Sequence, residues 1–265
     1  MCDLKVEVDK AGLMGSAPGK RETAAISMIA IVAGLFIWLV FWSLPNLDMT
    51  VSTSFTSDNG RFLLVGEPWI HTLRKFSLFL IFGFYVVVIG AWIDAYRRQV
   101  KILGKAWHKW SYLGFCALFG PVLLVNVILK GNWGRSRPQF LQEFGGTLEF
   151  TPFWQWADQC KDNCSFNSGE TAGVFMIFIS LAFIAETKLR YVIIVIGLVV
   201  SAFISWIRLA LGAHFLSDVL MSIVLMGLVA AVTHYFFYLC GTQWIERFDE
   251  KQQEKLSTSR VDTEI

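Results

Sequence analysis

The sequence predicts an all-α integral membrane protein, a bundle of six transmembrane helices. Hydrophobic residues make up 55% of the 265 positions and charged residues only 17%, a composition too apolar for an ordinary soluble domain of this length. A spanning helix needs about 20 mainly apolar residues. Six segments meet that requirement, namely 23–44, 73–96, 110–130, 170–186, 190–207 and 215–240.

The first apolar segment, 23–44, follows a polar stretch and has no obvious small-residue cleavage site, so we expect a retained helix rather than a signal peptide. Each later segment is bounded by charged or loop-forming residues. Proline is scarce, with six in the chain, and no long internal repeat is visible, which favours one domain over a solenoid or linked modules.

Lysine and arginine in the connections predict the orientation. They gather after the second and fourth segments, at Arg97, Arg98, Lys101, Lys105 and Lys109 and at Lys188 and Arg190. By the positive-inside rule these connections face the cytoplasm. We expect a cytoplasmic N-terminal tail over 1–22, a membrane domain over 23–242 and a cytoplasmic C-terminal tail over 243–265. The opposite side receives segment 45–72, the loop 131–169 and the turn near 208–214.

Two features on that opposite side stay open. Segment 45–72, with the charged Arg74 and Lys75 just beyond it, either covers a site or is a solvated connection, and the solvated connection is the simpler interpretation. Cys160 and Cys164 form a disulfide if the compartment is oxidising, or remain two free thiols. The net charge of +2 and the lack of a long basic stripe argue against a nucleic acid partner.

Three polar fragments next to the apolar segments indicate a phosphate site, because ionisable groups at membrane helices are costly and mark function. In the first, Lys130 closes the third segment and Arg137 follows seven positions later, so both face one side if the helix continues. Arg137 has the planar fork that suits phosphate oxygens, and Pro138 ends any helix there. Arg135 is either a third contact to the anion or, as the simpler interpretation, a solvated loop arginine.

The second fragment precedes the fourth segment and has the features of a helix start. Asn167 or Ser168 can cap the helix, and Gly169 lets a ligand approach the free N–H groups of the first turn. Glu170 there also favours the helix dipole, so an ordinary N-cap is the simpler interpretation of this fragment when it is considered alone.

The third fragment holds a histidine, a carboxylate and an arginine. His214 and Asp218 are four residues apart, so a helix that starts near Ala213 places both side chains on one face. A carboxylate there can fix the imidazole tautomer and leave the other ring nitrogen free to attack. Arg208 lies six residues upstream, at the outer end of the fifth segment.

Together the fragments resemble the signature of the type 2 phosphatidic acid phosphatase (PAP2) superfamily, which reads Lys-x6-Arg-Pro, Pro-Ser-Gly-His and Ser-Arg-x5-His-x3-Asp. Matching positions are Lys130, Arg137, Pro138, Ser168, Gly169, Arg208, His214 and Asp218. The sequence departs from the signature at Asn167 and Glu170, which replace Pro and His, and at Ile207, which replaces Ser.

The resemblance implies a six-helix bundle of the PAP2 type and a phosphatase that needs neither metal nor cofactor. His214 would be the nucleophile that forms a phosphohistidine, with Asp218 orienting it. Five groups would hold the phosphoryl oxygens, namely Lys130, Arg137, Ser168, Gly169 and Arg208. The resemblance also implies a multi-pass protein of the bacterial inner membrane whose active site faces the periplasm.

Glu170 stands where the family has the histidine that protonates the leaving oxygen. Three hypotheses follow for it: a carboxyl group with a raised pKa that serves as the acid, a substrate whose leaving group needs little help, or lost catalysis. Retention of the other charged signature residues makes lost catalysis the weakest of the three.

A site between helix ends favours a phosphate on a lipid headgroup, so the expected partners are a phosphorylated lipid and the bilayer. The resemblance is closest to bacterial enzymes that remove the 1- or 4′-phosphate of lipid A. Undecaprenyl diphosphate phosphatase, phosphatidylglycerophosphate phosphatase and a lipid phosphotransferase remain alternatives. A transporter or scaffold that binds anionic lipids without turnover is the non-enzymatic one. The sequence leaves the oligomeric state open.

Overall fold

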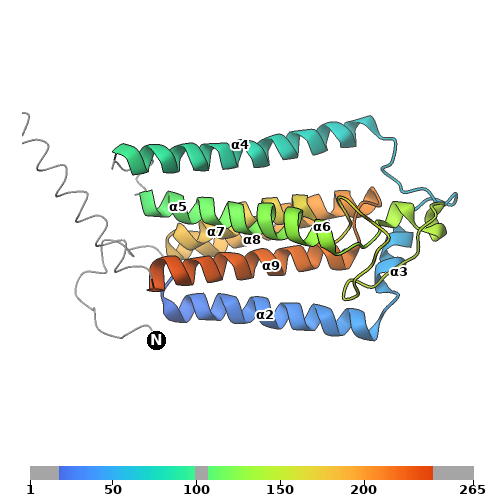
Figure 1. The fold of residues 1–265 in the computed structure, drawn as a ribbon, viewed down its shortest axis with the longest axis horizontal. Helices are drawn as coiled ribbons and strands as arrows, with labels where there is room; N and C mark the ends of the chain where they lie inside the picture. Colours follow the sequence, from blue (N-terminus) through green and yellow to red (C-terminus); the bar gives the residue numbers. More distant parts are fainter. Residues whose placement is uncertain (1–17, 99–106, 241–265) are drawn as a thin grey trace, which may run out of the picture.

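A computed structural model of the chain describes residues 18–98 and 107–240, which form helices joined by loops (Figure 1). The described residues contain no β-strand, only two isolated bridges. The long helices are α2 (Lys20–Ser43), α4 (Pro68–Arg98), α5 (Trp107–Ala117) continued by η1 (Leu118–Leu129) and α6 (Lys130–Asn132), α7 (Gly169–Ile184), α8 (Thr187–Ala210), and α9 (Leu216–His234) continued by η4 (Tyr235–Cys240).

All six apolar segments are helical, so the six-helix prediction is confirmed in outline. Five of the helices are long and apolar enough to cross a membrane, while α7 has 16 residues and falls short of that length. At 1.5 Å per residue α7 spans about 24 Å. Most of the two predicted tails, 1–22 and 243–265, lies outside the described residues, as does the centre of the connection after α4.

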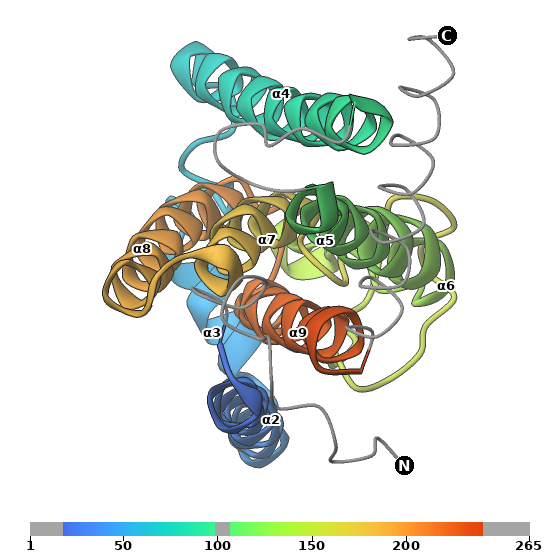
Figure 2. The ribbon, with the colours of Figure 1, turned by 90° about the vertical axis from the view of Figure 1, so that its left-hand side faces the viewer.

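Helix α7 occupies the centre of the bundle and packs against α5, η1, α8 and α9. Figure 2, a view along the bundle, places α4 and α2 at opposite outer edges. The apolar stretch of α2 is only 6% buried and that of α4 only 11% buried, against 50% for α9. The outer faces of α2 and α4 are therefore the surfaces that suit contact with lipid.

The middle of the third spanning helix is the π-helical segment η1, which contains Pro121. Proline has no N–H, and its ring clashes with a carbonyl of the preceding helical turn, so a regular α-helix is disfavoured there. The side chain of Asn126 donates a hydrogen bond to the Pro121 carbonyl at 2.7 Å. Regular α-helical geometry resumes at Lys130, where the site begins.

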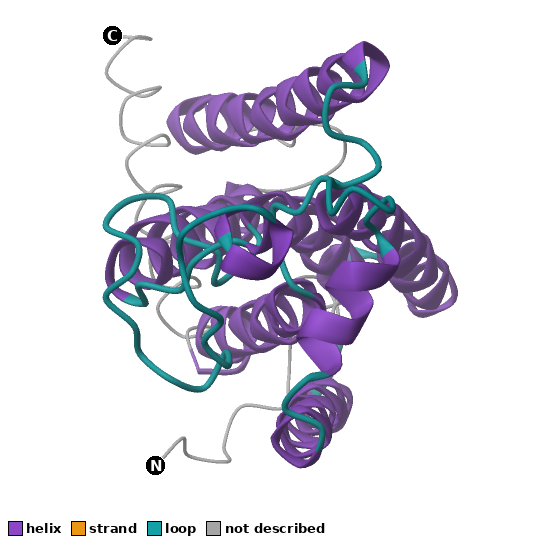
Figure 3. Ribbon diagram, turned by 90° about the vertical axis from the view of Figure 1, so that its right-hand side faces the viewer, coloured by secondary structure: helices purple, strands orange, loops and turns teal. Residues whose placement is uncertain are grey.

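The loops 45–67, 133–168 and 211–215 all lie at one end of the bundle, which Figure 3 views directly. They include a short helix, α3 (Leu47–Ser54), and the 3-10 turns η2 (Pro138–Phe140) and η3 (Gln142–Phe144). A disulfide joins Cys160 to Cys164, as one of the two sequence interpretations expected. This end, called the site end below, carries all three signature fragments.

Candidate active site

The N-terminus of α7 forms the floor of the site. Ser168 is the N-cap, and its buried hydroxyl accepts a hydrogen bond from the backbone N–H of Thr171 at 3.5 Å. Gly169 is the first residue of the helix. A Cβ there would lie 2.8 Å from Oδ1 of Asn126 and 3.2 Å from Nζ of Lys130. The missing side chain thus leaves room for the amide of Asn126 and the ammonium of Lys130 beside the first turn of α7.

Lys130 and Arg137 converge on one residue, but not by the expected route. The helix ends at Asn132, so the two cations do not share a helix face. Instead, the ammonium of Lys130 donates to Oδ1 of Asn163 at 3.2 Å. The guanidinium of Arg137 donates twice to the Asn163 carbonyl, at 3.2 and 2.7 Å. Asn163 belongs to the small loop that the Cys160–Cys164 disulfide closes.

His214 lies in the turn before α9, and this corrects the expectation that a helix starts near Ala213. Its Nδ1 is 2.8 Å from the carbonyl oxygen of Ser165. A carbonyl can only accept a hydrogen bond, so Nδ1 carries the proton and the Nε2 lone pair is free. The carboxylate of Asp218 is 3.8 Å from Nδ1. The Ser165 carbonyl is thus the hydrogen-bond partner of the imidazole, and Asp218 lies within ion-pair distance of the same nitrogen.

The charge state of His214 also follows from its surroundings. Burial is the main cause that lowers the pKa of His214 to about 4, and the charges of Arg208 and Lys130 lower it further. The Asp218 carboxylate acts in the opposite direction. The imidazole is therefore neutral near pH 7, which is the form that can attack phosphorus.

Asp218 anchors the turn that carries His214. One of its oxygens accepts hydrogen bonds from the hydroxyl of Ser165 at 2.5 Å and from the N–H of Phe215 at 2.9 Å. The Phe215 contact caps the first turn of α9. The other oxygen accepts from the guanidinium of Arg135 at 2.5 Å. Asp218 thus fixes both the turn at Phe215, directly after His214, and the segment around Ser165, whose carbonyl accepts the hydrogen bond from His214.

The interpretation of Arg135 as a solvated loop residue is wrong, because its side chain is completely buried. Besides Asp218 it binds the carboxylate of Asp48 at 2.7 Å, and it stacks 4.1 Å from the ring centroid of Phe215. Asp48 in turn accepts hydrogen bonds from Ser217, at 2.9 Å from the backbone and 2.5 Å from the side chain. Helix α3 is thereby fixed to α9, so segment 45–72 is not simply a solvated connection.

Glu170 points toward two arginines. Its Oε1 accepts from Nε of Arg74 at 2.8 Å and lies 3.3 Å from a terminal nitrogen of Arg208. Arg208 is buried, and its Nε has no hydrogen-bond partner among the described residues. Sequence reasoning did not place Arg74 in the site, because it belongs to no signature fragment.

The arrangement combines a neutral imidazole, a cluster of cations and the N-terminus of a helix. Such a cluster binds a tetrahedral anion, and the free Nε2 can attack it. Among the predicted site residues, the structure brings together Lys130, Arg137, Gly169, Glu170 and Arg208 around His214. The hydroxyl of Ser168 is committed to capping.

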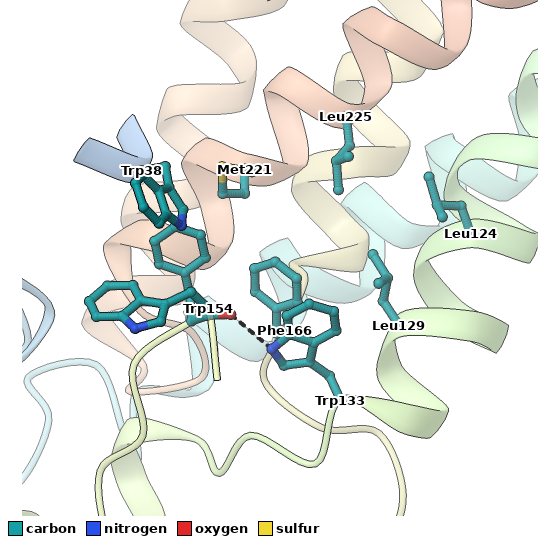
Figure 4. Close-up of a pocket in the computed structure, with 9 residues that line it drawn as sticks. Trp38, Leu124, Leu129, Trp133, Trp154, Phe166, Met221 and Leu225 are labelled. Carbon is teal, nitrogen blue, oxygen red and sulfur yellow. Dashed lines mark hydrogen bonds between the residues drawn. The ribbon is translucent and has the colours of Figure 1, made fainter. Parts of the chain in front are cut away.

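An apolar cavity of about 410 Å³ lies beside these elements (Figure 4). Its walls come from α2, η1, α9 and the loop after α6, through Trp38, Leu124, Leu129, Trp133, Phe153, Trp154, Phe166, Met221 and Leu225. The indole of Trp133 donates to the Phe153 carbonyl at 2.9 Å, which holds the loop in place. Leu129 directly precedes Lys130, and Phe166 lies two residues before Ser168, so the cavity and the site share two segments of the chain.

Comparisons with known proteins bear on the family of this chain. The family model for the PAP2 superfamily matches residues 109–241. The chain is similar to a lipid A 4′-phosphatase of Francisella tularensis subsp. novicida, with 27% identity over 80% of this chain and 95% of that protein. It is 37% identical to a lipid A 4′-phosphatase of Rhizobium etli and 42% identical to one of Rhizobium leguminosarum, in both cases over 59% of this chain, covering 63% and 70% of those proteins.

A solved structure of similar fold is the transmembrane PAP2-type phosphatidylglycerolphosphate phosphatase from Bacillus subtilis. The match has a TM-score of 0.47 and 18% identity, and it covers 85% of this chain and 96% of that one.

Proposed function

The chain belongs to the PAP2 superfamily, and we propose that this membrane lipid phosphatase removes a phosphate monoester from the headgroup of lipid A through a phosphohistidine. The observation that carries the proposal is the neutral His214 imidazole, with Nδ1 bound to a carbonyl and Nε2 free, next to a cluster of cations. Its relatives named lipid A 4′-phosphatase support the choice of lipid.

In the proposed reaction, Lys130, Arg137 and Arg208 bind the phosphoryl oxygens together with the first-turn N–H groups of α7. Nε2 of His214 attacks phosphorus, and the bond from phosphorus to the lipid oxygen breaks. The departing oxygen takes its proton from water. A second water then attacks the phosphohistidine, which frees inorganic phosphate and restores His214. The cations stabilise the charge on the equatorial oxygens in both steps.

Asp218 acts in this scheme through position rather than through direct contact with the imidazole. It holds Ser165, whose carbonyl binds Nδ1, and it holds the backbone turn at Phe215. Because its carboxylate is 3.8 Å from Nδ1, its negative charge also stabilises the imidazole as positive charge develops during attack. The predicted role of Asp218 is to orient the imidazole. Here the Ser165 carbonyl lies between Asp218 and the imidazole and transmits part of that orienting effect.

The apolar cavity supports a lipid as the substrate. A volume of about 410 Å³ lies within the range of small-molecule sites, and its lining residues are Trp, Phe, Leu and Met. We propose that it receives an acyl chain while the phosphorylated headgroup lies on the cations. The acyl chain would reach the cavity from the apolar bilayer, so its contribution to binding would come from packing against these side chains rather than from transfer out of water.

The proposed location is the bacterial inner membrane, with the site end facing the periplasm and both termini in the cytoplasm. Basic residues near the opposite end, such as Arg98 and Lys188, favour this orientation by the positive-inside rule. The disulfide at the site end also suits an oxidising compartment.

The decisive experiment measures free phosphate released by the purified protein in detergent with EDTA present. The substrates are lipid A, undecaprenyl diphosphate and phosphatidylglycerophosphate. We expect release from lipid A by the unchanged protein and none by His214→Ala, whereas the matched control His71→Ala, an exposed histidine at the same end, stays fully active. Acid-labile phosphate bound to the protein would identify the intermediate.

Turnover by a folded His214→Ala protein would reject the mechanism. Transfer of the phosphate to an acceptor lipid, with no free phosphate, would instead identify a phosphotransferase built on the same site.

A further inference from the structure

Arg74 in the second turn of α4 contacts the site from the outer edge of the bundle. Its Nε donates to Oε1 of Glu170 at 2.8 Å, and the same oxygen lies 3.3 Å from Arg208. The terminal nitrogens of Arg74 make no hydrogen bond to any described residue. When a planar guanidinium is held at Nε, its two terminal nitrogens remain available as donors in a fixed direction. This geometry suits phosphate oxygens.

The charges around the site leave room for an anion. Arg74, Lys130, Arg137 and Arg208 carry positive charge, and Glu170 is the carboxylate that pairs with two of them. Burial lowers the pKa of Arg137, and the nearby charge of Arg74 lowers it further, so these two guanidinium groups lie within electrostatic range of each other. A phosphate dianion would relieve this excess of positive charge.

Exposure distinguishes the two arginines that share Glu170. The side chain of Arg208 is 4% exposed, and that of Arg74 is 41% exposed. Arg208 is therefore fixed inside the bundle, whereas Arg74 stands at the open side of the cluster. A ligand that enters from the membrane surface meets Arg74 before it reaches Arg208.

We infer that Arg74 is a further phosphate-binding residue and that Glu170 is a positioning residue which holds Arg74 and Arg208 toward the phosphate. The inference rests on the proposed phosphatase function. It also accounts for the departure from the family signature: the carboxylate at position 170 comes with an extra arginine that neutralises it. In this arrangement Glu170 accepts hydrogen bonds and does not donate the proton to the leaving group.

The first test compares two neighbouring cations. Arg74→Gln removes the proposed contact, and Lys75→Gln removes one positive charge from an exposed position next to it. A hydrogen bond between charged groups contributes enough for Arg74→Gln to raise both KM and the inhibition constant of inorganic phosphate about tenfold. Lys75→Gln leaves both values unchanged. An unchanged inhibition constant in Arg74→Gln would overturn the inference for Arg74.

The second test separates a positioning Glu170 from an acidic one. With Glu170→Gln, we expect kcat to fall by the same factor for a lipid monophosphate and for a lipid diphosphate, whose leaving group needs no proton. We also expect weaker inhibition by inorganic phosphate, an effect that loss of a general acid does not produce. A loss confined to the monophosphate would show that Glu170 is the acid.

The variants distinguish failure of the proposed phosphatase mechanism from failure of the inference about Arg74. If His214→Ala is inactive while Arg74→Gln behaves like the unchanged protein, the phosphatase mechanism stands and the inference about Arg74 is wrong. If His214→Ala retains turnover, the proposed mechanism itself is wrong, whatever Arg74→Gln does. Thermal unfolding in detergent confirms that each variant is folded before its kinetics are compared.

Discussion

Arg190 and Arg208 lie near opposite ends of α8, and both are almost completely buried, but their donors are used differently. Arg190 bonds to the carboxylate of Glu22 and to the carbonyls of Ala182 and Ala185, at 3.1 and 3.0 Å. Arg208 has one ion-pair contact of 3.3 Å with Glu170, and its Nε has no partner among the described residues.

The contrast shows how to separate a cation that stabilises the fold from one that binds a ligand. Burying a guanidinium is costly unless its donors are satisfied. At Arg190 the protein satisfies them itself, by joining α2 to the end of α7. At Arg208 the cost of burying the guanidinium is only partly offset, and a bound phosphate would accept the hydrogen bonds that the protein leaves unmade. Burial alone does not distinguish the two roles, whereas the unused donor does.

The largest expected effect comes from removing Arg208, the arginine with an unused donor. Arg208→Gln should lower kcat about 10³-fold, because an arginine that stabilises the charge on a transferred phosphoryl group contributes on that scale. Phosphate release from lipid A measures it. The control is Arg61→Gln, an exposed arginine at the same end. Near-normal turnover in Arg208→Gln would place Arg208 with the structural arginines.

Arg135 combines features of the two arginines. It is buried and paired like Arg190, but it lies at the site end like Arg208. Arg135→Gln leaves Asp48 and Asp218 without their common cation. We expect the free energy of unfolding to fall by about 3 kcal/mol. Turnover per folded molecule should fall as well, because Asp218 fixes the turn that carries His214. Unfolding in mixed SDS micelles and phosphate release measure the two effects.

In this variant, lost stability with unchanged turnover would show that the turn is held without Asp218. The companion variant Asp48→Asn retains the size of the side chain, and we expect it to reproduce a smaller part of both losses.

Arg190→Gln should give the opposite pattern to Arg208→Gln. The pair with Glu22 is lost, and two helix-end carbonyls lose their donor. Because the Glu22 side chain is 26% exposed and partly solvated, the expected loss of unfolding free energy is about 2 kcal/mol. Turnover per folded molecule stays unchanged. Lys188→Gln, exposed two residues away, is the control, and a specific loss of kcat in Arg190→Gln would contradict the assignment.

The smallest expected effect concerns pH. The pKa of His214 is lowered to about 4 from an ordinary value of 6.5, so this imidazole stays neutral between these values. After correction for titration of the substrate phosphate, the acidic limb of kcat/KM should lie near pH 4. A limb near pH 6.5 would show that burial and the nearby cations do not lower the pKa of His214 as described.

The same shift affects stability with a definite sign. As pH falls from 6.5 to 4, the unfolded chain takes up the proton that the folded protein excludes, so His214 lowers the free energy of unfolding over that range. Above pH 6.5 its contribution is constant. Thermal unfolding of the unchanged protein and of His214→Ala between pH 4 and pH 7 isolates the contribution of His214 to the free energy of unfolding.

The sequence predicted the helices well, because membrane thickness and hydropathy act on each segment separately. It also predicted Lys130, Arg137, Gly169 and Arg208 as site residues, which the structure brings together, since short signatures keep their chemistry within a few positions. It could not identify Arg74 or the role of Arg135, whose partners Glu170 and Asp48 lie 96 and 87 residues away. Those pairs arise from the packing of α4 and α3 against the core, and no local spacing encodes them.

The local geometry around His214 was mispredicted for a related reason. A spacing of four suggested a shared helix face with Asp218, but α9 begins only at Leu216. The contact that fixes the imidazole comes from the carbonyl of Ser165, and any residue type provides a carbonyl. A backbone acceptor therefore leaves no trace in the amino-acid pattern.

The bonds of Arg135 also bear on how the protein is assembled. Asp48 follows α2, Arg135 follows α6, and Asp218 lies in the first turn of α9. A growing chain therefore exposes Asp48 first and Arg135 next, and Asp218 becomes available only when α9 enters the bundle. His214, the proposed nucleophile, enters the bundle with α9 as well. A nascent chain without α9 would thus lack both His214 and the complete Asp48–Arg135–Asp218 network. Hydrolysis would therefore begin only after α9 has packed into the bundle.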